Sequence, residues 1–296
     1  MRILLAGASG FIGTALDGRL RDDGHETRRL VRRPPGSATE IQWDPHGSPL
    51  ERGLVDDYDA VVNVAGAPIA HWPWTASYKQ TLLTSRTNTT RTLAEAIAAA
   101  DKKPALVNAS AVGYFGDRGD ENLDDESPPG TDFLARLVQE WEAASAAAVD
   151  AGARVARIRA GIVLQRDGGI LKLARIPFWL GLGGRIAGGE QWFPTVSLVD
   201  YLDVASRLVA DDSMSGSFNV VGPEPATNAD FTRALGQRLR RPTVVPVPGF
   251  AVRTITGNDL SVQLLGSIRA HPRRLLEAGY EFRHPTVGDQ LDAALA

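Results

Sequence analysis

The sequence predicts an α/β fold in which a doubly wound parallel sheet carries a smaller C-terminal domain. Short apolar runs alternate with helical patterns along the first half of the chain. Runs such as residues 3–6, where every residue is apolar, are typical of parallel strands that helices cover on both faces. With 296 residues, 43% of them hydrophobic, the chain can bury a sizeable core in one large or two modest domains.

The elements of the first half follow in a regular order. Strands are expected at residues 3–6, 27–31, 60–64, 105–109 and 155–158. Helices are expected at 14–21, 87–100 and 134–149, of which the last two are rich in alanine, a strong helix former. Crossovers between the parallel strands should be right-handed.

The sequence changes character after about residue 165. Segment 181–194 is rich in glycine and should be a loop, whereas residues 217–221 form one more strand. Thr227 and Asp230 have the spacing of a capping box, so a helix should begin there and run to residue 239. A proline-rich stretch and two short helices, near residues 275 and 291, should complete the chain.

These elements predict two interleaved domains. Residues 1–165 should form the first domain, and the strand at 217–221 should return to its sheet. Residues 166–296 should form the smaller domain that covers the site, with residues 245–296 as its C-terminal module.

The composition excludes several classes of function. A net charge of −3 without long runs of one sign argues against binding to nucleic acid or to an anionic membrane. The chain has no cysteine, which excludes disulfides, thiolate metal sites and a cysteine nucleophile. Its five histidines are scattered without ligand spacing, so we expect no metal site. The N-terminal apolar run is too short for a signal peptide or a membrane span, and we expect a cytoplasmic protein. The sequence does not indicate an oligomeric state.

A glycine pattern directly follows the first predicted strand and opens the first helix. In Gly7-Ala8-Ser9-Gly10-Phe11-Ile12-Gly13, the first glycine permits a tight turn and the second lets a pyrophosphate approach the backbone. The third lets helix and strand pack closely, and the helix N-terminus attracts the phosphates. An ordinary strand–turn–helix connection is the alternative. In this context the pattern predicts a Rossmann-type dinucleotide site at Gly7, Ser9, Gly10, Phe11, Ile12 and Gly13.

The end of the second strand distinguishes between the two nicotinamide dinucleotides. An acidic residue there would bind the ribose 2′-hydroxyl, but the chain has Val31-Arg32-Arg33. A guanidinium suits a 2′-phosphate, so Val31 and Arg32 predict NADP(H) and make residues 1–165 the NADP-binding domain. Asp44 could still contact the adenosine side, which leaves NAD(H) as the alternative.

Further motifs make the chain resemble a known superfamily. The glycine pattern and Asn63-Val64-Ala65-Gly66 resemble the extended short-chain dehydrogenases/reductases. More specific pieces occur at residues 72–75, 85–90, 110–117, 141–142, 181–194 and 271–282. Together they resemble the atypical, epimerase-like branch, which carries a C-terminal domain of unknown function. The resemblance covers nearly the whole chain.

The resemblance implies further cofactor contacts. Val64, Ala65 and Gly66 would pass beneath the dinucleotide, Arg86 would lie near it on the following helix, and Ile162 would meet the nicotinamide amide. Simple packing is the alternative role for Ala65 and Ile162.

Two departures from the family pattern concern the chemistry. Catalytic members use a serine or threonine, a tyrosine and a lysine to orient the substrate and move a proton. Here Leu134 and Val138 occupy the tyrosine and lysine positions, and Ala111 occupies the serine position. Phe193 replaces an arginine that often binds the diphosphate of sugar nucleotides, which favours an apolar or planar ligand instead.

Replacement chemistry has to come from neighbouring residues. Ser110 and Tyr114, at the carboxyl end of the strand at 105–109, are the catalytic candidates, and Asp117 and Glu142 are possible carboxylates. Each also has a structural alternative: Tyr114 could pack under the cofactor, and Ser110 could bond a backbone group at the strand end. Asp117 could cap a turn, and Glu142 could anchor its helix to the sheet. Three residues of the glycine-rich loop are candidates for substrate contact: Arg185, Gln191 and Trp192.

Two functions remain open. The first is an NADP-binding, epimerase-like oxidoreductase of the atypical short-chain type that acts on an unidentified small molecule. The second is a catalytically silent NADP(H)-binding sensor or interaction module. A cavity over the nicotinamide position would support the enzyme, whereas Leu134, Val138 and Phe193 filling that space would support the module.

Overall fold

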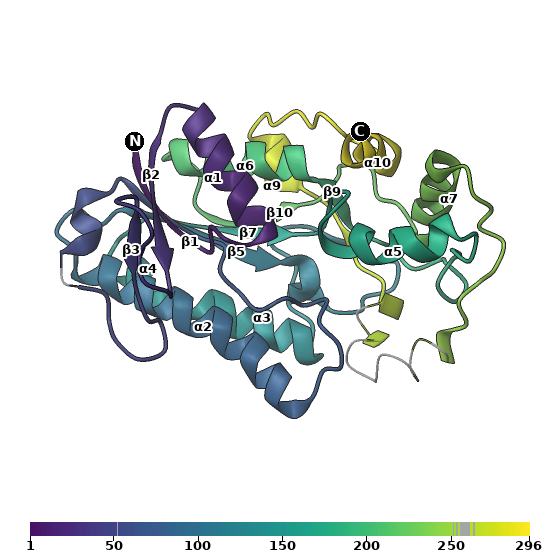
Figure 1. Cartoon of the computed structure of the whole chain (residues 1–296), viewed down its shortest axis with the longest axis horizontal. Helices are drawn as coiled ribbons and strands as arrows, with labels where there is room; N and C mark the ends of the chain where they lie inside the picture. Colours follow the sequence, from purple (N-terminus) through teal and green to yellow (C-terminus); the bar gives the residue numbers. More distant parts are fainter. Residues whose placement is uncertain (52, 251, 253, 255–260, 263) are drawn as a thin grey trace.

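The computed structural model describes every residue except 52, 251, 253, 255–260 and 263. Its centre is a seven-stranded sheet of order β10-β7-β5-β4-β1-β2-β3, in which every neighbouring pair is parallel (Figure 1). The strands are β1 (Arg2–Ala6), β2 (Glu26–Val31), β3 (Glu40–Gln42), β4 (Ala60–Asn63), β5 (Ala105–Ala111), β7 (Val155–Ala160) and β10 (Gly216–Val220). The prediction of a doubly wound parallel sheet is confirmed.

Helices cover both faces of the sheet. One face carries α1 (Phe11–Asp22) and α6 (Leu198–Ala210), and the other carries α2 (Ala76–Ala99), α3 (Phe133–Ala143) and α4 (Ala146–Asp150) (Figure 1). Successive residues of β1 therefore enter different cores. Ile3 and Leu5 belong to the cluster beneath α1 and α6, whereas Leu4 belongs to the cluster beneath α2. A strand buried on both faces favours apolar residues on both sides, which is why β1 lacks alternation between apolar and polar residues.

Helix α2 begins at Ala76, well before the predicted start at residue 87. Its first turns are polar and hid the helix from sequence reasoning, but Thr75 caps it by accepting a hydrogen bond from the Tyr78 amide. The predicted helix 134–149 is two helices that separate at Ser145. The Ser145 hydroxyl binds the Glu142 carbonyl oxygen at 2.7 Å, which competes with continuation of the helix.

The C-terminal half contains more regular structure than predicted. Besides α6, the described residues there include the helices α5 (Gly169–Trp179), α7 (Asn228–Leu239), α9 (Arg273–Glu277) and α10 (Val287–Leu295). Strands β8 (Ile162–Leu164) and β9 (Thr195–Ser197) pair with each other, as do β6 (Asn122–Leu123) and β11 (Arg269–Ala270). Two 3-10 helices, η1 (Leu54–Asp57) and η2 (Val112–Phe115), complete the described elements. The capping box at Thr227 and Asp230 is present as predicted.

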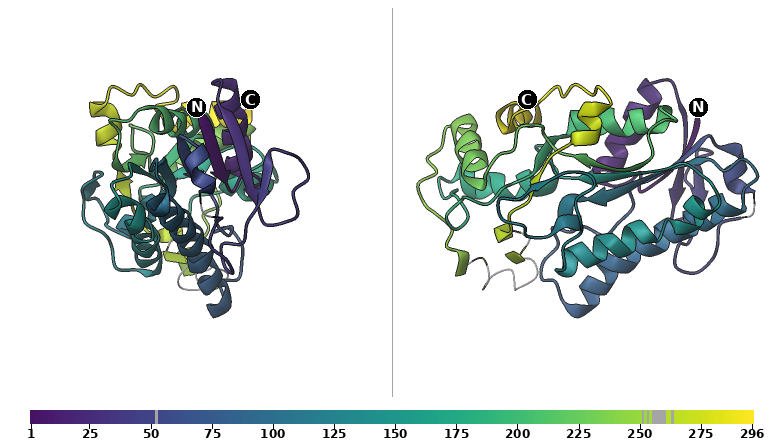
Figure 2. Two further views of the ribbon diagram at one scale, coloured as in Figure 1. Left: turned by 90° about the vertical axis from the view of Figure 1, so that its left-hand side faces the viewer. Right: turned by 180° about the vertical axis from the view of Figure 1, so that it is seen from behind.

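Some C-terminal elements lie beyond the ends of the central strands, and others join the central sheet or one of its helical layers. Helices α5, α7 and α10 gather beyond the carboxyl ends of the central strands, and Figure 2 shows the same arrangement from behind. Strand β10 joins the main sheet beside β7, and α6 packs against α1. The return of a strand near residues 217–221 is therefore confirmed, whereas the contribution of α6 to the first layer was missed.

The first turn of α1 is packed too closely for a side chain. A Cβ atom on Gly13 would lie 2.1 Å from the Gly7 carbonyl oxygen, whereas one on Gly18 of the same helix would meet nothing within 4 Å. Gly13→Ala should therefore lower the free energy of unfolding by about 1–3 kcal/mol. Gly18→Ala should raise it by about 0.5–1 kcal/mol, because alanine loses less backbone entropy in a helix. Urea unfolding measures both values, and equal changes would show that the Gly13 contact is not tight.

Candidate functional site

The glycine turn brings β1, β4 and α1 into backbone contact. Gly7 has φ of +89°, and a Cβ there would lie 2.6 Å from the Ala65 amide nitrogen. A Cβ on Gly10 would instead meet only the Gly7 oxygen, at 3.4 Å, so this position faces open space. Gly10 is the N-cap of α1, and no side chain caps the helix. The first amide groups of α1 are therefore available to an anion.

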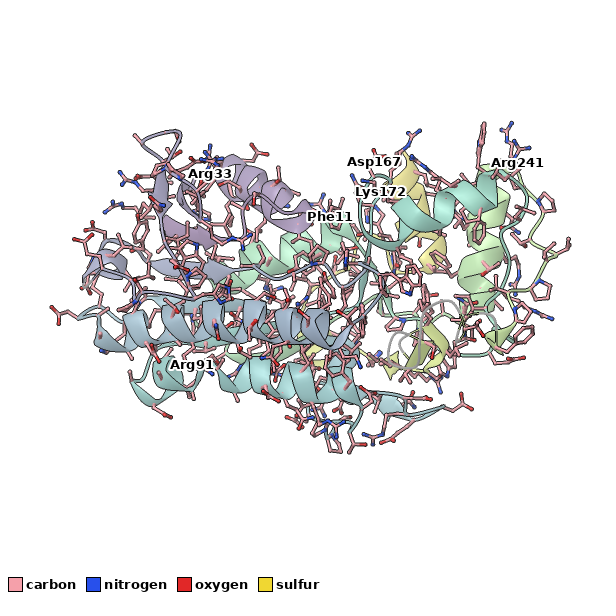
Figure 3. The ribbon with its side chains drawn as sticks, turned by 60° about the horizontal axis from the view of Figure 1, so that its bottom comes forward. Phe11, Arg33, Arg91, Asp167, Lys172 and Arg241 are labelled. Atoms are coloured by element: carbon pink, nitrogen blue, oxygen red, sulfur yellow. The ribbon has the colours of Figure 1, made fainter. Side chains whose placement is uncertain are left out.

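The aromatic residue of this turn reaches the segment that opens α5. Figure 3 shows Phe11 near Asp167 and Lys172. A Cβ on Gly168 would lie 2.4 Å from the Phe11 ring, so ring and glycine are in direct contact. The C-terminal half thus lies against one side of the glycine turn.

The two arginines after β2 have different surroundings. Arg33 donates two hydrogen bonds of 2.8 Å to Glu40. These bonds raise the pKa of Arg33 and, together with the Gly36 amide, lower the pKa of Glu40 to about 2. Arg32 makes no hydrogen bond or ion pair within the part of the chain that the structure describes. Its side chain lines a pocket of about 460 Å³, together with Trp43, Asp44 and Leu50. Arg32 is therefore available to a ligand, and Arg33 is occupied.

Buried polar groups hold the chain as it leaves β4. The Asn63 side chain donates to Asn108 at 2.8 Å and to Thr90 at 3.1 Å, and it accepts from the Ala65 amide at 3.1 Å. These bonds fix the turn through Val64 and Ala65. Because the groups are buried and bonded to one another, the position of this backbone is strongly determined.

Arg86 is a buried cation beneath the same loop. Its guanidinium donates to the carbonyl oxygens of Leu82 and Ala67, both at 3.0 Å, and lies 5.2 Å from the centre of the Trp141 ring. Among the described residues no carboxylate contacts it. Burial lowers the pKa of Arg86 to about 10, so it remains charged at neutral pH. A buried charge without a counter-charge is costly, which makes an anionic ligand a favourable neighbour.

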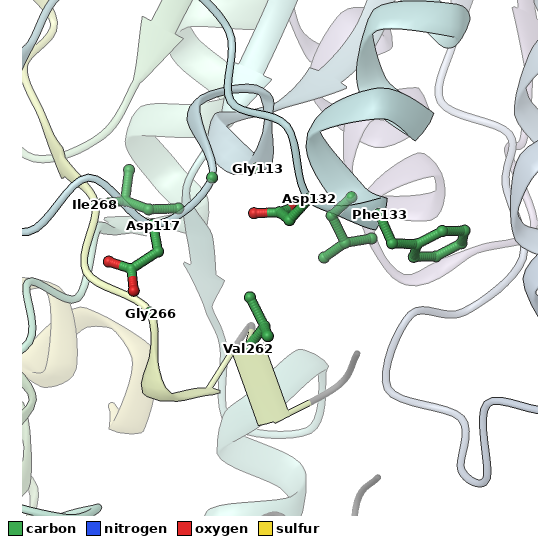
Figure 4. Close-up of a pocket in the computed structure, with 9 residues that line it drawn as sticks. Gly113, Asp117, Asp132, Phe133, Val262, Gly266 and Ile268 are labelled. Carbon is green, nitrogen blue, oxygen red and sulfur yellow. The ribbon is translucent and has the colours of Figure 1, made fainter. Parts of the chain in front are cut away.

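Helix α3 presents an apolar stripe where a tyrosine and a lysine would stand. Leu134 and Val138 are 6% and 3% exposed and form a cluster with Trp74, Leu82 and Leu137. A cavity of about 30 Å³ lies beside Leu134, with Gly113 and Ile268 on one side and Asp132 and Phe133 on the other (Figure 4). Its volume suits one or two water molecules.

Ser110 and Tyr114 meet at a buried ion pair. Glu142 of α3 accepts two hydrogen bonds of 2.8 Å from Arg159 of β7, and a third of 2.6 Å from the Ser110 hydroxyl. The Arg159 guanidinium lies 3.6 Å from the centre of the Tyr114 ring. Hydrogen bonding to Glu142 outweighs burial and raises the pKa of Arg159. Glu142 therefore anchors α3 to the sheet, which is the structural alternative that the sequence offered for it.

The residues of the glycine-rich loop make internal contacts. The Gln191 amide donates to the carbonyl oxygens of Ile186 at 3.1 Å and Leu264 at 3.4 Å. Trp192 donates its ring N–H to Asp120 at 2.8 Å. Arg185 has an exposed side chain, and its carbonyl oxygen accepts from the Val247 amide. The glycine-rich loop is thus hydrogen-bonded to Val247 and Leu264 of the C-terminal segment.

The expectation that Phe193 faces the ligand is wrong. Its ring is 5% exposed and lies 5.0 Å from that of Phe231, inside the cluster formed by α5, α7 and α10. Leu134 and Val138 belong to a different cluster. The carbonyl oxygen of Pro194 accepts from the Ile162 amide at 2.8 Å, so backbone pairing between β8 and the start of β9 turns Phe193 inward.

Sequence reasoning missed Arg159 and Tyr78. Arg159 is one of two arginines in β7, and a charged residue in a strand that is covered on both faces indicates a buried partner. Tyr78 lies in the polar first turns of α2, which carried no helix signal. Among the described residues, no cluster of three or more acidic or histidine side chains could hold a metal ion. Within that same part of the chain, no helix is long and apolar enough to cross a membrane.

The fold and the site define a dinucleotide-binding α/β protein. A tight glycine turn, an uncapped helix N-terminus and an unpaired arginine beyond the second strand meet at the carboxyl edge of a parallel sheet. The chain belongs to the NAD dependent epimerase/dehydratase family, whose model matches residues 3–160. Residues 247–294 match a domain of unknown function, DUF1731. The resemblance to the epimerase-like branch is thereby confirmed.

Individual relatives match along the whole chain. An epimerase family protein of Mycobacterium leprae is 41% identical over 292 residues, which cover 99% of this chain and 95% of the relative. The human epimerase family protein SDR39U1, solved with NADPH, is 35% identical with a TM-score of 0.91, and 99% of each chain is covered. A nucleoside-diphosphate sugar epimerase of Corynebacterium glutamicum is 34% identical with a TM-score of 0.83. That alignment covers all of this chain and 58% of the other.

The Glu142–Arg159 pair should contribute strongly to stability. Their side chains are 11% and 6% exposed, so Glu142→Gln leaves a buried guanidinium without its counter-charge. We expect the free energy of unfolding to fall by about 3 kcal/mol. Glu140→Gln, on an exposed position of the same helix, should change it by less than about 0.5 kcal/mol. Urea denaturation compares the two variants, and similar losses would show that Arg159 does not depend on Glu142.

Proposed function

We propose that the protein is an NADP(H)-binding, epimerase-like oxidoreductase that acts on a small molecule. One observation carries the cofactor assignment: Arg32 lines a pocket of about 460 Å³ and has no hydrogen-bond or ion-pair partner among the described residues, whereas Arg33 is bound to Glu40. A planar guanidinium at this place suits the 2′-phosphate that distinguishes NADP from NAD. The human relative solved with NADPH supports the same choice.

The residues present fit the dinucleotide. Gly10 leaves open space at the uncapped end of α1, where amides of residues 11–13 would bind the pyrophosphate together with Ser9. Val64, Ala65 and Gly66 offer backbone beneath it. Arg86, half-buried Ile162 and Val31 complete the proposed contacts.

When bound, the nicotinamide ring supplies a hydride to a carbonyl carbon or removes one from an alcohol carbon. The chain itself has to orient the substrate, exclude water and move the proton. Ser110 and Tyr114 are the proposed catalytic residues that orient the substrate, because they lie where β5 leaves the sheet. Arg185, Gln191 and Trp192 are the proposed substrate contacts, since their loop is hydrogen-bonded to Leu264 and Ser267, next to residues that line the cavity beside Leu134.

A second function, a silent NADP(H)-binding sensor or interaction module, is favoured by one observation. Leu134 and Val138 are buried in an apolar cluster, and the adjoining cavity of about 30 Å³ is too small for a substrate without movement of its walls. Oxidation of NADPH in the presence of a panel of aldehydes and ketones distinguishes the two functions. Turnover supports the enzyme, and tight binding without turnover supports the module.

Arg32→Ala should raise the dissociation constant of NADPH by about 10- to 100-fold, because a charge-assisted contact to the 2′-phosphate is lost. The dissociation constant of NADH, which lacks that phosphate, should change by less than about 2-fold. Arg33→Ala is the matched control, and it should affect NADPH much less because Arg33 is bound to Glu40. Calorimetric titration of each variant with both cofactors measures these effects. A larger loss in Arg33→Ala would assign the phosphate contact to Arg33, and preference for NADH in the unaltered protein would overturn the NADP(H) proposal.

A further inference from the structure

A second tyrosine lies beside the apolar stripe of α3. Tyr78, in the first turn of α2, packs against the cluster that contains Leu134 and Val138. Its hydroxyl donates a hydrogen bond of 2.5 Å to the carbonyl oxygen of Pro68. Pro68 belongs to the loop that leaves β4 directly after Val64, Ala65 and Gly66. The phenol thus lies between that backbone and the positions where α3 lacks a tyrosine and a lysine.

Arg86 supports this phenol from the same helix. Eight residues separate Tyr78 from Arg86, roughly two helical turns, so both side chains project toward the same side of α2. Arg86 binds the carbonyl oxygen of Ala67, and Tyr78 binds that of Pro68. The cation and the phenol therefore hold consecutive carbonyl groups of one loop.

The surroundings of Tyr78 suit a proton donor. Burial raises the pKa of Tyr78, and the charge of Arg86 opposes that rise because it favours the phenolate. The other titratable groups near it are His71, whose ring centre lies 4.3 Å from that of Tyr78, and Lys79, which lies over the Phe133 ring. Helix α3 presents only apolar side chains to this cluster.

Within the described residues, the cation beside Tyr114 is paired with a carboxylate, unlike Arg86 beside Tyr78. The guanidinium over its ring belongs to Arg159, whose charge Glu142 already balances through two hydrogen bonds. Arg86 has no carboxylate partner among the residues that the structure describes. An uncompensated cation stabilises a neighbouring phenolate more strongly than a paired one does.

We propose that Tyr78 is the residue that exchanges a proton with the substrate oxygen, and that Arg86 is its positioning residue. A tyrosine and a cation on α2 would thus replace the pair that α3 lacks. This inference rests on the proposed NADP(H)-dependent function.

In the direction of reduction, the carbonyl carbon gains a hydride from the reduced nicotinamide dinucleotide, which becomes the oxidised form. The substrate carbonyl oxygen replaces the Pro68 carbonyl oxygen as the acceptor of the Tyr78 hydroxyl, gains its proton, and becomes a C–OH group. The phenolate left on Tyr78 then takes a proton from water. The reverse sequence oxidises the alcohol, with Tyr78 accepting the hydroxyl proton.

The test uses the full chain, with its five tyrosines labelled with carbon-13 at Cζ, bound in turn to NADPH and NADP⁺. Tyr78→Phe assigns the Tyr78 signal by its loss. Only the oxidised nicotinamide ring carries a positive charge, so the pKa of a phenol beside it should be lower, by roughly one, in the NADP⁺ complex than in the NADPH complex. The Cζ signal of Tyr78 should also move between the two complexes. Tyr58, which packs against Arg2 beneath the far end of the sheet, is the control and should not respond.

Each outcome decides the proposal. A response of Tyr78 supports it, whereas a response of Tyr114 instead, or of no tyrosine, overturns it. Arg86→Gln should raise the pKa of Tyr78 by about one in the cofactor-free protein, and Arg86→Lys should restore it. An unchanged pKa in Arg86→Gln would remove Arg86 from the proposal. Failure of the unaltered protein to bind either cofactor would instead refute the proposed function.

For any carbonyl compound that the protein reduces, Tyr78→Phe should lower kcat by about 100-fold or more while the dissociation constant of NADPH stays unchanged. Tyr58→Phe should retain kcat. A Tyr78→Phe variant with full kcat would overturn the assignment of the proton donor.

Discussion

The backbone contact between Gly7 and Ala65 is the constraint on which the rest of the site depends. No side chain fits between these segments, because a Cβ on Gly7 would lie 2.6 Å from the Ala65 amide nitrogen. The contact fixes the exits of β1 and β4 relative to each other, and the parallel order of the sheet places both at one edge. The loop that follows Ala65 is then held by Arg86 and Tyr78, two side chains of α2. A single close approach therefore positions both the proposed phosphate site and the proposed proton donor.

The two buried arginines show opposite ways of keeping a charge inside the protein. Arg159 is paired with Glu142 in a bidentate geometry, which stabilises α3 on the sheet and leaves little charge for chemistry. Within the described part of the chain, Arg86 is bound only by carbonyl oxygens and an aromatic face, so its charge acts on its neighbours. In an interior of low dielectric constant this difference is large, because an uncompensated charge is felt over longer distances. Although α3 has neither the tyrosine nor the lysine, α2 thus supplies a phenol and a cation, Tyr78 and Arg86, for the proposed chemistry.

Sequence reasoning predicted the fold better than the contacts within the site. Strand positions were predictable because burial on both faces favours consecutive apolar residues, as at residues 3–6 and 60–62. The capping box at Thr227 was predictable because it is a local hydrogen-bond pattern. The start of α2 was not, since its polar first turns carry no periodic signal and depend on the Thr75 cap. Phe193 was expected near the ligand because it replaces an arginine that often binds the diphosphate of sugar nucleotides. In the structure its ring instead lies in the core, next to the pairing of β8 with β9.

The sequence by itself determined the parallel sheet, the glycine turn and the presence of two arginines after the second strand. These features are local, because each depends on residues adjacent in the chain or on a short period. Only the tertiary structure decided which arginine is free, because Glu40 of β3 binds Arg33 and leaves Arg32 beside the pocket. It also brought Tyr78 and Arg86 of α2 to the loop after β4 and beside the stripe of α3. Such contacts join segments far apart in the chain, and their geometry follows from packing of whole helices and strands rather than from any local pattern.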